Sequence, residues 1–417
     1  MSETLRTPLP LPGAENCVHC GFCLQACPTY LALDDENDSP RGRIVLMKAL
    51  ADGSLSADDA SAQLHIDRCL GCRACETACP SGVPYGELLE LTRERGAARR
   101  TLPFVARMIL FVFSRPALLA ITMWKARVLR ATGIPSLLSR LPGRLGFGMA
   151  MLASTRRTRA EASRAYDPHG GGARGSVATL RGCVMEGLFA PANRATERTL
   201  AVNGYSLVRA DGQRCCGALH AHAGDAAAAR ELARANIAAF ERSGAECIAV
   251  NSAGCGAAMK EYAHLLGGDS AWAERARAFS ARVRDVSELL AAAGPRVGGG
   301  LPVKVAYDAP CHLLHGQRIA AAPLAVLAAI PGLERVPLAD SEQCCGSAGI
   351  YNLVEPDMSN MVLAPKLANI EATGAAIVAT GNPGCLMQIG AGLLRSGSAT
   401  QLRHPVELLD ASYERMR

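Results

Sequence analysis

CVHCGFCLQACP at residues 17–28 and CLGCRACETACP at residues 69–80 share one spacing, C-x2-C-x2-C-x3-C-P. This spacing is typical of chain segments that hold [4Fe–4S] clusters. Three closely spaced thiolates can wrap one face of a cubane, and the fourth cysteine in two-cluster proteins ligates the other cluster. Structural zinc sites usually use two C-x2-C pairs instead. The runs therefore predict two [4Fe–4S] clusters, held by Cys17, Cys20, Cys23, Cys27, Cys69, Cys72, Cys75 and Cys79.

Composition indicates a globular protein of two or three domains. The chain has 417 residues, of which 49% are hydrophobic and 20% charged, and its net charge is +6. Only 4% of residues are aromatic, so stacking platforms are scarce and no nucleic-acid partner is expected. The mild positive charge is compatible with an acidic partner surface or an anionic membrane face.

The cysteine content, 17 residues, points to metal or redox chemistry. The first residues, MSETLRTPLPLPGAEN, show neither a basic segment nor an apolar segment of the kind found in export signals. We therefore expect a cytoplasmic protein with reduced thiols, which at most lies peripherally on the inner face of the cytoplasmic membrane.

Residues 1–100 are predicted to form a mostly helical domain around the two clusters, in which residues 1–16 are an arm or a short leader. The 41 residues between the runs contain SPRGRIVLMKAL at residues 39–50, with a capping serine, a proline at the first helical position and an apolar face at helical spacing. A second helix is expected near residues 56–65. Arg41 and Arg43 either face the clusters or a partner, or are solvated charges at the helix start.

Residues 101–170 are predicted to form a helical connector ending in a charged, glycine-rich linker, with a domain boundary near residue 170. Its apolar part, residues 102–130, is interrupted by basic residues and Pro116 and has no run of the ~18–20 apolar residues that a spanning helix needs. Three interpretations are open: core and inter-domain packing, a docking face for a partner subunit, or a basic amphipathic stretch on a membrane surface.

Residues 171–295 and 296–417 are two copies of one repeat. Four cysteine landmarks recur with offsets of 128, 129, 129 and 130 residues, and each copy contains a Cys-Cys-Gly triplet. Within each copy, short apolar strands alternate with Ala/Leu-rich helical segments such as residues 225–242 and 360–373. This alternation predicts a parallel α/β unit with helices on both faces, so the whole chain is expected to be an α+β multidomain protein.

The repeated cysteines are predicted to gather at one sheet edge in each copy. Several follow directly after a strand, and the carboxyl ends of parallel strands are where ligands bind in open α/β sheets. Four thiols at one edge can hold an iron–sulfur cluster or zinc, or perform dithiol–disulfide chemistry. Cys247 is instead interpreted as a packing residue. The candidate metal or redox residues are Cys183, Cys215, Cys216 and Cys255, and Cys311, Cys344, Cys345 and Cys385.

With two cysteine runs followed by two Cys-Cys-Gly repeats, the chain resembles the iron–sulfur subunits of flavin-linked 2-hydroxy-acid dehydrogenases, most closely the glycolate oxidase iron–sulfur subunits. The flanks at residues 17–30, 40–44 and 67–82 carry this resemblance. The anaerobic glycerol-3-phosphate dehydrogenase small subunit and heterodisulfide reductase share the same modules. The resemblance implies that one cluster takes Cys17, Cys20, Cys23 and Cys79, and the other Cys69, Cys72, Cys75 and Cys27.

The chain departs from the heterodisulfide reductase pattern at the end of each repeat. Those relatives hold noncubane clusters with a C-x-x-C pair there, whereas Ser252 and Asn382 occupy the first position of the pair here. Each copy is one thiol short, so a cubane or zinc fits the remaining four cysteines better than a noncubane cluster.

No dinucleotide-type glycine fingerprint after a strand, no phosphate-binding loop and no catalytic triad can be argued from the sequence. We therefore expect no flavin in this chain and no catalytic residues for substrate oxidation. The predicted role is electron transfer from a flavin-containing dehydrogenase subunit, which oxidises a 2-hydroxy acid such as glycolate, to a quinone or another acceptor. The alternatives are a thiol–disulfide reductase subunit, a subunit of a lactate or glycerol-3-phosphate dehydrogenase, and a zinc-stabilised docking platform in the repeats.

Overall fold

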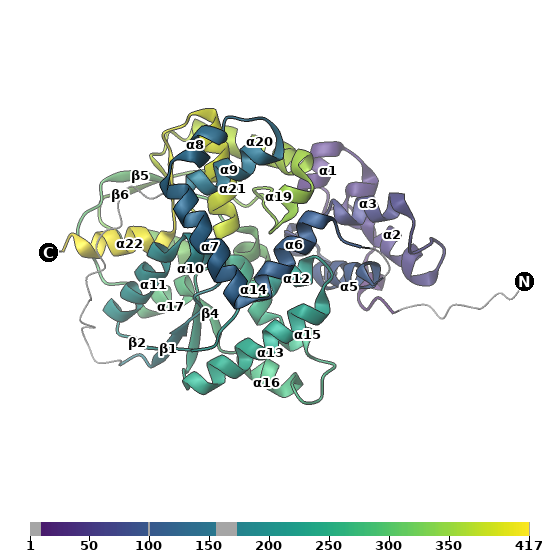
Figure 1. Cartoon of the computed structure of the whole chain (residues 1–417), viewed down its shortest axis with the longest axis horizontal. Helices are drawn as coiled ribbons and strands as arrows, with labels where there is room; N and C mark the ends of the chain where they lie inside the picture. Colours follow the sequence, from purple (N-terminus) through teal and green to yellow (C-terminus); the bar gives the residue numbers. More distant parts are fainter. Residues whose placement is uncertain (1–9, 99–100, 156–172, 417) are drawn as a thin grey trace, which may run out of the picture.

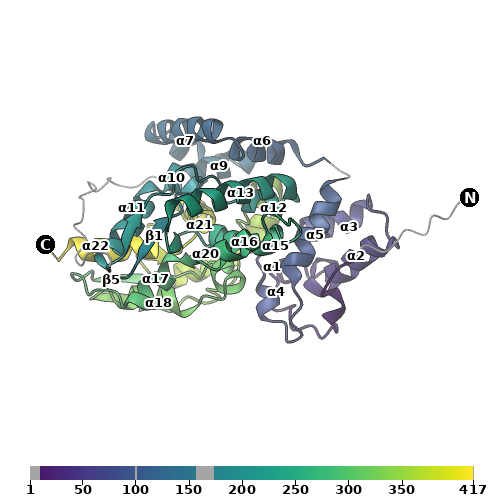
Figure 2. The same cartoon turned by 90° about the horizontal axis from the view of Figure 1, so that it is seen from below.

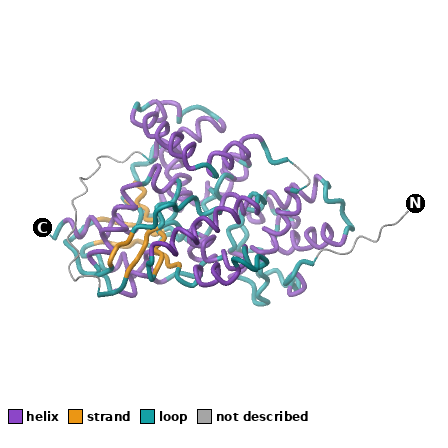
Figure 3. The backbone as a smooth tube through the Cα atoms, turned by 60° about the horizontal axis from the view of Figure 1, so that its bottom comes forward, coloured by secondary structure: helices purple, strands orange, loops and turns teal. Residues whose placement is uncertain are grey.

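The computed structural model describes residues 10–98, 101–155 and 173–416. A helical N-terminal part lies at one end of an elongated molecule, and the two α/β repeats fill the other (Figure 1). The strands all lie within the repeats (Figure 3). The chain is thus an α+β multidomain protein, as predicted. Most of the predicted arm, the predicted linker and the boundary near residue 170 lie outside the described residues.

The N-terminal part is built from short helices around the two cysteine runs. Ser39 accepts a hydrogen bond from the Gly42 amide at 3.0 Å and so caps α2, which begins at Pro40 as predicted. The second expected helix begins later, because Asp59 caps it and accepts a bond from the Ala62 amide at 2.8 Å. The elements are η1 (Ala14–Asn16), α1 (Pro28–Leu33), η2 (Glu36–Asp38), α2 (Pro40–Asp52), α3 (Ala60–Asp67), α4 (Ala74–Thr77) and α5 (Tyr85–Ala97).

The connector consists of α6 (Phe104–Phe113), α7 (Pro116–Ala131), α8 (Ile134–Leu138) and α9 (Gly143–Ser154). Helix α9 packs on α21 (Pro383–Ser396) of the second repeat and buries Phe147, Ala150 and Met151 in its core. Helix α7 contains no fully buried residue, but its half-buried Met123 and Ala126 pack against α10 (Val184–Leu188), so the packing interpretation holds for its inner side only. Among the described residues, no single helix is long and apolar enough to cross a membrane. Helices α6 and α7 meet that test only as a pair, bent by 108°.

Each repeat contains a four-stranded parallel sheet. The first has the order β2-β1-β3-β4 and the second β6-β5-β7-β8, so the two copies share one topology. Strands β1, β3 and β5 follow the predicted segments, and Cys247 lies on β3 as expected. The strands are β1 (Ser176–Thr179), β2 (Ser206–Val208), β3 (Cys247–Val250), β4 (Val283–Asp285), β5 (Val303–Tyr307), β6 (Leu333–Val336), β7 (Ile377–Ala379) and β8 (Gln401–Arg403).

Helices cover the sheets and join the repeats. In the first repeat they are α10 (Val184–Leu188), α11 (Ala190–Val202), α12 (Ala218–His222), α13 (Ala226–Ser243), α14 (Ala253–Lys260), α15 (Tyr262–Leu265), α16 (Ala273–Ser280) and α17 (Val286–Ala293). In the second they are η3 (His312–Gly316), α18 (Ala321–Ala328), α19 (Tyr351–Val354), α20 (Pro356–Ala372), α21 (Pro383–Ser396) and α22 (Pro405–Glu414).

One hydrophobic core runs through both repeats. Helix α11 packs on α22 and α17 packs on α18, and the buried apolar residues between them, such as Leu200, Leu290 and Leu409, form one continuous cluster. The repeats are therefore fixed relative to each other by apolar burial, which is the dominant stabilising term in such packing. As a result, the two cysteine-bearing sheet edges face the same space.

Candidate iron–sulfur and thiol sites

The first cysteine group surrounds a small cavity near the surface. The cavity is lined by Cys17, Cys20, Cys23, Cys75 and Cys79. His19 and Gly21 have positive φ angles of 55° and 87°, so the backbone folds tightly between the cysteines. Cys20 is exposed, whereas burial raises the pKa of the Cys23 thiol to about 11. Buried thiols resist ionisation unless a cation compensates, which suits a metal-bound group.

The second group is buried. Cys27, Cys69, Cys72 and Cys75 lie close enough for their charges to interact, and burial raises the pKa values of Cys72 and Cys75 well above the usual range. Cys27 therefore lies near the second run and also near Cys23, whereas Cys79 lines the first cavity. The crossed pairing stays a prediction that these positions permit.

Hydrogen-bond donors point at the sulfurs of this second group. The Gly71 amide lies 3.4 Å from Cys69 Sγ, and the Tyr85 hydroxyl lies 3.5 Å from the same atom. Arg43 Nη1 lies 3.9 Å from Cys27 Sγ. Donors to cluster sulfurs raise the reduction potential, so these three groups would tune a cluster held there. Sequence reasoning missed Tyr85, since nothing in its local sequence distinguishes it from a core aromatic.

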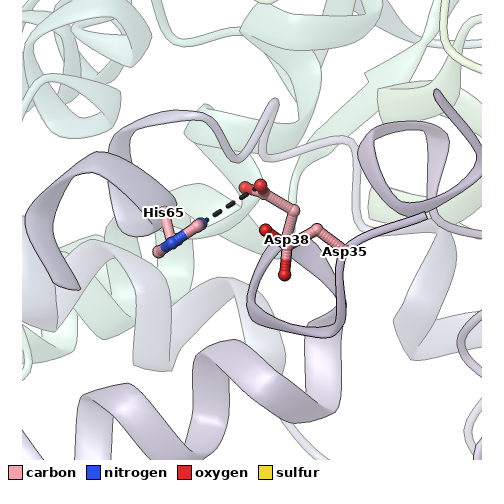
Figure 4. Close-up of side chains that lie close together, drawn as sticks. All are labelled: Asp35, Asp38 and His65. Carbon is pink, nitrogen blue, oxygen red and sulfur yellow. Dashed lines mark ion pairs between the residues drawn. The ribbon is translucent and has the colours of Figure 1, made fainter. Parts of the chain in front are cut away.

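Arg43 belongs to a buried ion-pair network beneath the second group. Its Nη2 lies 3.0 Å from Asp38 Oδ1, and Arg68 Nη1 and His65 Nδ1 both lie 3.1 Å from Asp38 Oδ2. Figure 4 shows Asp38 facing His65, with Asp35 nearby, a grouping that resembles a metal site. Because two guanidinium groups already neutralise Asp38, we interpret the cluster as a structural brace. Arg41 instead lies beside the first group and donates to the His19 carbonyl at 3.1 Å.

All eight candidate cysteines of the repeats line a single cavity of about 280 Å³ between the two sheet edges. The sequence predicted four thiols at each edge, but not that the edges face each other. Cys215 Sγ lies 3.7 Å from Cys183 Sγ, and Cys345 Sγ lies 3.4 Å from Cys385 Sγ. Hydrogen bonds from the neighbouring thiols lower the pKa values of Cys215 and Cys344 well below the usual range, in the same way in both copies.

Ser252 and Asn382, which stand where a further cysteine was expected, also line this cavity. Asn382 Oδ1 accepts a bond from the Gly254 amide at 3.2 Å, and the Ala253 amide donates to the Gly381 carbonyl at 3.0 Å. The Asn382 side chain also lies 3.5 Å from Cys385 Sγ. Asn382 therefore joins the two repeats at the cavity, a role that a thiol would fill poorly.

The second cysteine group lies directly beside this cavity. Leu70, Cys72, Cys311 and Cys344 pack in one buried cluster, and the charges of Cys72 and Cys344 interact. The Tyr351 hydroxyl donates to the Arg68 carbonyl at 2.8 Å, and Arg73 pairs with Glu261. The contacts between the N-terminal part and the repeats thus place the three thiol groups one after another in space: first the surface group, then the buried group, then the shared cavity.

The glycine of each Cys-Cys-Gly triplet has a left-handed backbone, but the two differ in surroundings. Gly217 has φ 86° and Gly346 has φ 84°. A Cβ at Gly346 would lie 2.5 Å from the Ser359 carbonyl oxygen, whereas at Gly217 the nearest atoms are 3.4 Å away. The absence of a side chain therefore permits a close backbone approach at Gly346, whereas Gly217 has no such close neighbour.

We expect Gly217→Ala to lower the free energy of unfolding by about 1–2 kcal/mol, the cost of a left-handed alanine. Gly346→Ala should cost an additional ~1–3 kcal/mol, because the backbone must also move to relieve the overlap. Thermal unfolding of the two variants, compared with the unchanged protein, measures the difference. Equal melting temperatures for the two variants would show that the contact at Ser359 is easily relieved.

Comparisons with known proteins agree with the order of the modules along the chain, two cysteine runs followed by two Cys-Cys-Gly repeats. The profile of a 4Fe-4S dicluster domain matches residues 13–83, and that of a cysteine-rich domain matches residues 177–260 and 305–390. A probable glycolate oxidase iron-sulfur subunit from Bacillus subtilis is 38% identical, over 94% of this chain and 93% of its own length. The glycolate oxidase iron-sulfur subunit of Escherichia coli is 34% identical, over 96% and 94%. A lactate utilization protein A from an Exiguobacterium strain is 31% identical over 56% of this chain.

Proposed function

The chain belongs to the family of glycolate oxidase iron–sulfur subunits, and we propose that it relays electrons from a flavin-containing partner subunit to a quinone or another acceptor. As an iron–sulfur electron-transfer component of an oxidoreductase complex, it would leave the oxidation of glycolate or a related 2-hydroxy acid to that partner. When bound, [4Fe–4S] clusters accept and release single electrons.

One observation supports the proposal above all others: the three thiol groups form a continuous series from the surface into the molecule. Cys20 is exposed and lies between Val18 and Phe22, which are 68% and 67% exposed. This apolar rim suits contact with a partner subunit at the first group. Cys75, a member of the buried group, also lines the cavity of the first group. Cys72 of the buried group lies near Cys344 in the shared cavity.

The proposal is tested by anaerobic purification of the full chain with its clusters. We expect about eight iron atoms from the two cubanes, with any further iron or zinc coming from the repeat cavity. On reduction, electron paramagnetic resonance should show two spin-coupled clusters. The chain alone should carry no flavin, and glycolate should reduce the clusters only when the partner subunit is present. A chain without iron would rule the relay out.

Two other functions remain as alternatives for the repeat cavity. Thiol–disulfide reduction draws support from the lowered pKa values of Cys215 and Cys344, since a thiolate is the nucleophile in disulfide exchange. Under that alternative, Cys344→Ser abolishes disulfide turnover and leaves the N-terminal cluster signals intact. Zinc in the cavity, without additional iron, would instead support a structural platform.

A further inference from the structure

The α6–α7 pair carries an apolar surface that no described element covers. Residues of α6 that face the molecule, such as Ala106 and Leu110, are buried, whereas Phe104 on the opposite side is 72% exposed. On α7, Ile121 and Trp124 are 51% and 58% exposed. The large exposed apolar side chains of this surface are Phe104, Val105, Met108, Phe111, Leu118, Ile121, Trp124 and Val128.

Helical periodicity places these side chains on the outer face of each helix. On α7, Leu118, Ile121, Trp124 and Val128 follow one another at intervals of three or four residues, so they form one stripe. The opposite side contacts the body: Met123 and Ala126 pack with α10, and Arg130 donates to the Leu188 carbonyl at 3.2 Å. Helix α7 is therefore held by a few inward side chains while its apolar stripe points away.

The charge of this region has one sign. Residues 96–155 contain no aspartate or glutamate, whereas α6, α7 and the turn between them contain Arg107, Arg115, Lys125, Arg127 and Arg130. All of these except Arg130 are exposed. Lys125 and Arg127 lie on the two sides of the α7 stripe, next to Trp124. A protein partner would need an acidic surface with a matching apolar groove, whereas a bilayer with anionic headgroups offers both properties over any area.

The shape of the pair also fits a flat surface. Helices α6 and α7 form a V when the molecule is seen face-on (Figure 1), and both lie along its outermost edge in the perpendicular view (Figure 2). Their 108° bend lies between Phe113 and Pro116, where Pro116 begins α7. Because both helices lie along the same outer edge, their two stripes can rest on one plane together.

We propose that the outer face of α6 and α7 docks on the surface of an anionic lipid bilayer. The apolar stripes enter the boundary between headgroups and acyl chains, the basic side chains contact the headgroups, and Trp124 lies at the interface that tryptophan prefers. The inward side of α6 lines the thiol cavity through Ile109 and Phe113. If the proposed relay holds, docking brings that cavity beside the lipid phase, where a quinone would be found.

Flotation of the purified full chain with vesicles tests the docking. Vesicles of phosphatidylcholine with phosphatidylglycerol should carry the protein, and phosphatidylcholine alone should carry at least tenfold less. Ile121→Asp/Trp124→Asp should reduce binding at least tenfold, because charges replace the apolar stripe. Lys125→Glu/Arg127→Glu should abolish the preference for the anionic vesicles. Val297→Asp is the matched control, since Val297 is 70% exposed and belongs to another surface; it should bind like the unchanged chain.

Two readouts keep the test decisive. Iron content and cluster spectra of each variant should equal those of the unchanged chain, because no residue of α7 is buried. In a Trp272→Phe background, brominated acyl chains should quench Trp124 fluorescence. Equal vesicle binding by the stripe variant and the control would overturn the proposal. The proposal would also be overturned if the partner subunits covered the apolar stripe and the chain bound to neither type of vesicle. Neither result affects the relay, which the iron content tests separately.

Discussion

Replacing Cys79 by alanine should remove the first [4Fe–4S] cluster and keep the second, although Cys79 belongs to the second cysteine run. The structure places Cys79 at the cavity lined by Cys17, Cys20 and Cys23, whereas Cys27 lies with the buried group. Alanine offers no ligand atom, so the site would retain three thiolates. We expect iron to fall by about four atoms, because one cubane is lost.

The identity of the lost cluster is read from matched variants. With crossed ligation, the spectrum of Cys79→Ala equals that of Cys20→Ala and differs from that of Cys72→Ala. With ligation inside each run, Cys79→Ala would equal Cys72→Ala instead, which would contradict the pairing. The spin coupling between the two clusters should disappear in all three variants. Cys247→Ala, on strand β3 and remote from the clusters, should keep full iron and coupling.

The sequence predicted the elements of this protein better than their assembly. The paired cysteine runs, the cap at Ser39 and the duplicated strands follow from local rules, and the structure has all of them. The same rules correctly placed the repeat cysteines after strands. They did not reveal that both repeats share one core, because packing such as that of α11 on α22 depends on how separate units dock.

At the site too, local sequence rules could not predict the shared cavity or the contacts of the buried Arg43. Asn382 was recognised as a departure from a pattern, but its bond to Gly254 crosses between repeats and has no local signal. For Arg43, a residue near a helix start, solvated charge and contact with a cluster were equally reasonable interpretations. Its four partners come from three separate segments, and only the folded chain brings them together.

Arg43→Met should destabilise the N-terminal part and weaken retention of the second cluster. Arg43 is 1% exposed, and its guanidinium donates to the His65 carbonyl at 2.7 Å, Thr29 Oγ1 at 2.9 Å and Asp38 at 3.0 Å. Burial alone would lower the pKa of Arg43, but its charge interactions with Cys69, Tyr85, Cys27 and Asp38 together raise it above its ordinary value. The protein thus holds this cation in place at the base of the second group.

Removal of one partner from a buried ion pair typically costs about 3–5 kcal/mol, because the other charge stays buried. Arg68 and His65 still face Asp38, so the loss should fall near the lower end of that range. Arg43→Lys should recover only part of it, since an ammonium cannot reproduce the planar fork that reaches several acceptors. The measurement is the temperature at which cluster absorbance is lost under anaerobic conditions, together with iron content.

Arg41→Met is the matched control, because Arg41 lies on the same helix and pairs with Glu36 at the surface. Exposed pairs contribute about 0–1 kcal/mol, and Arg41 lies beside the first group, so this variant should lose its second cluster at nearly the same temperature as the unchanged chain. Iron loss in Arg43→Met should come from the second cluster, so its remaining spectrum should resemble that of Cys72→Ala. If Arg43→Met and Arg41→Met behaved alike, the buried network would be neutral for stability, and the positive charge beside Cys27 would not be needed to hold a cluster there.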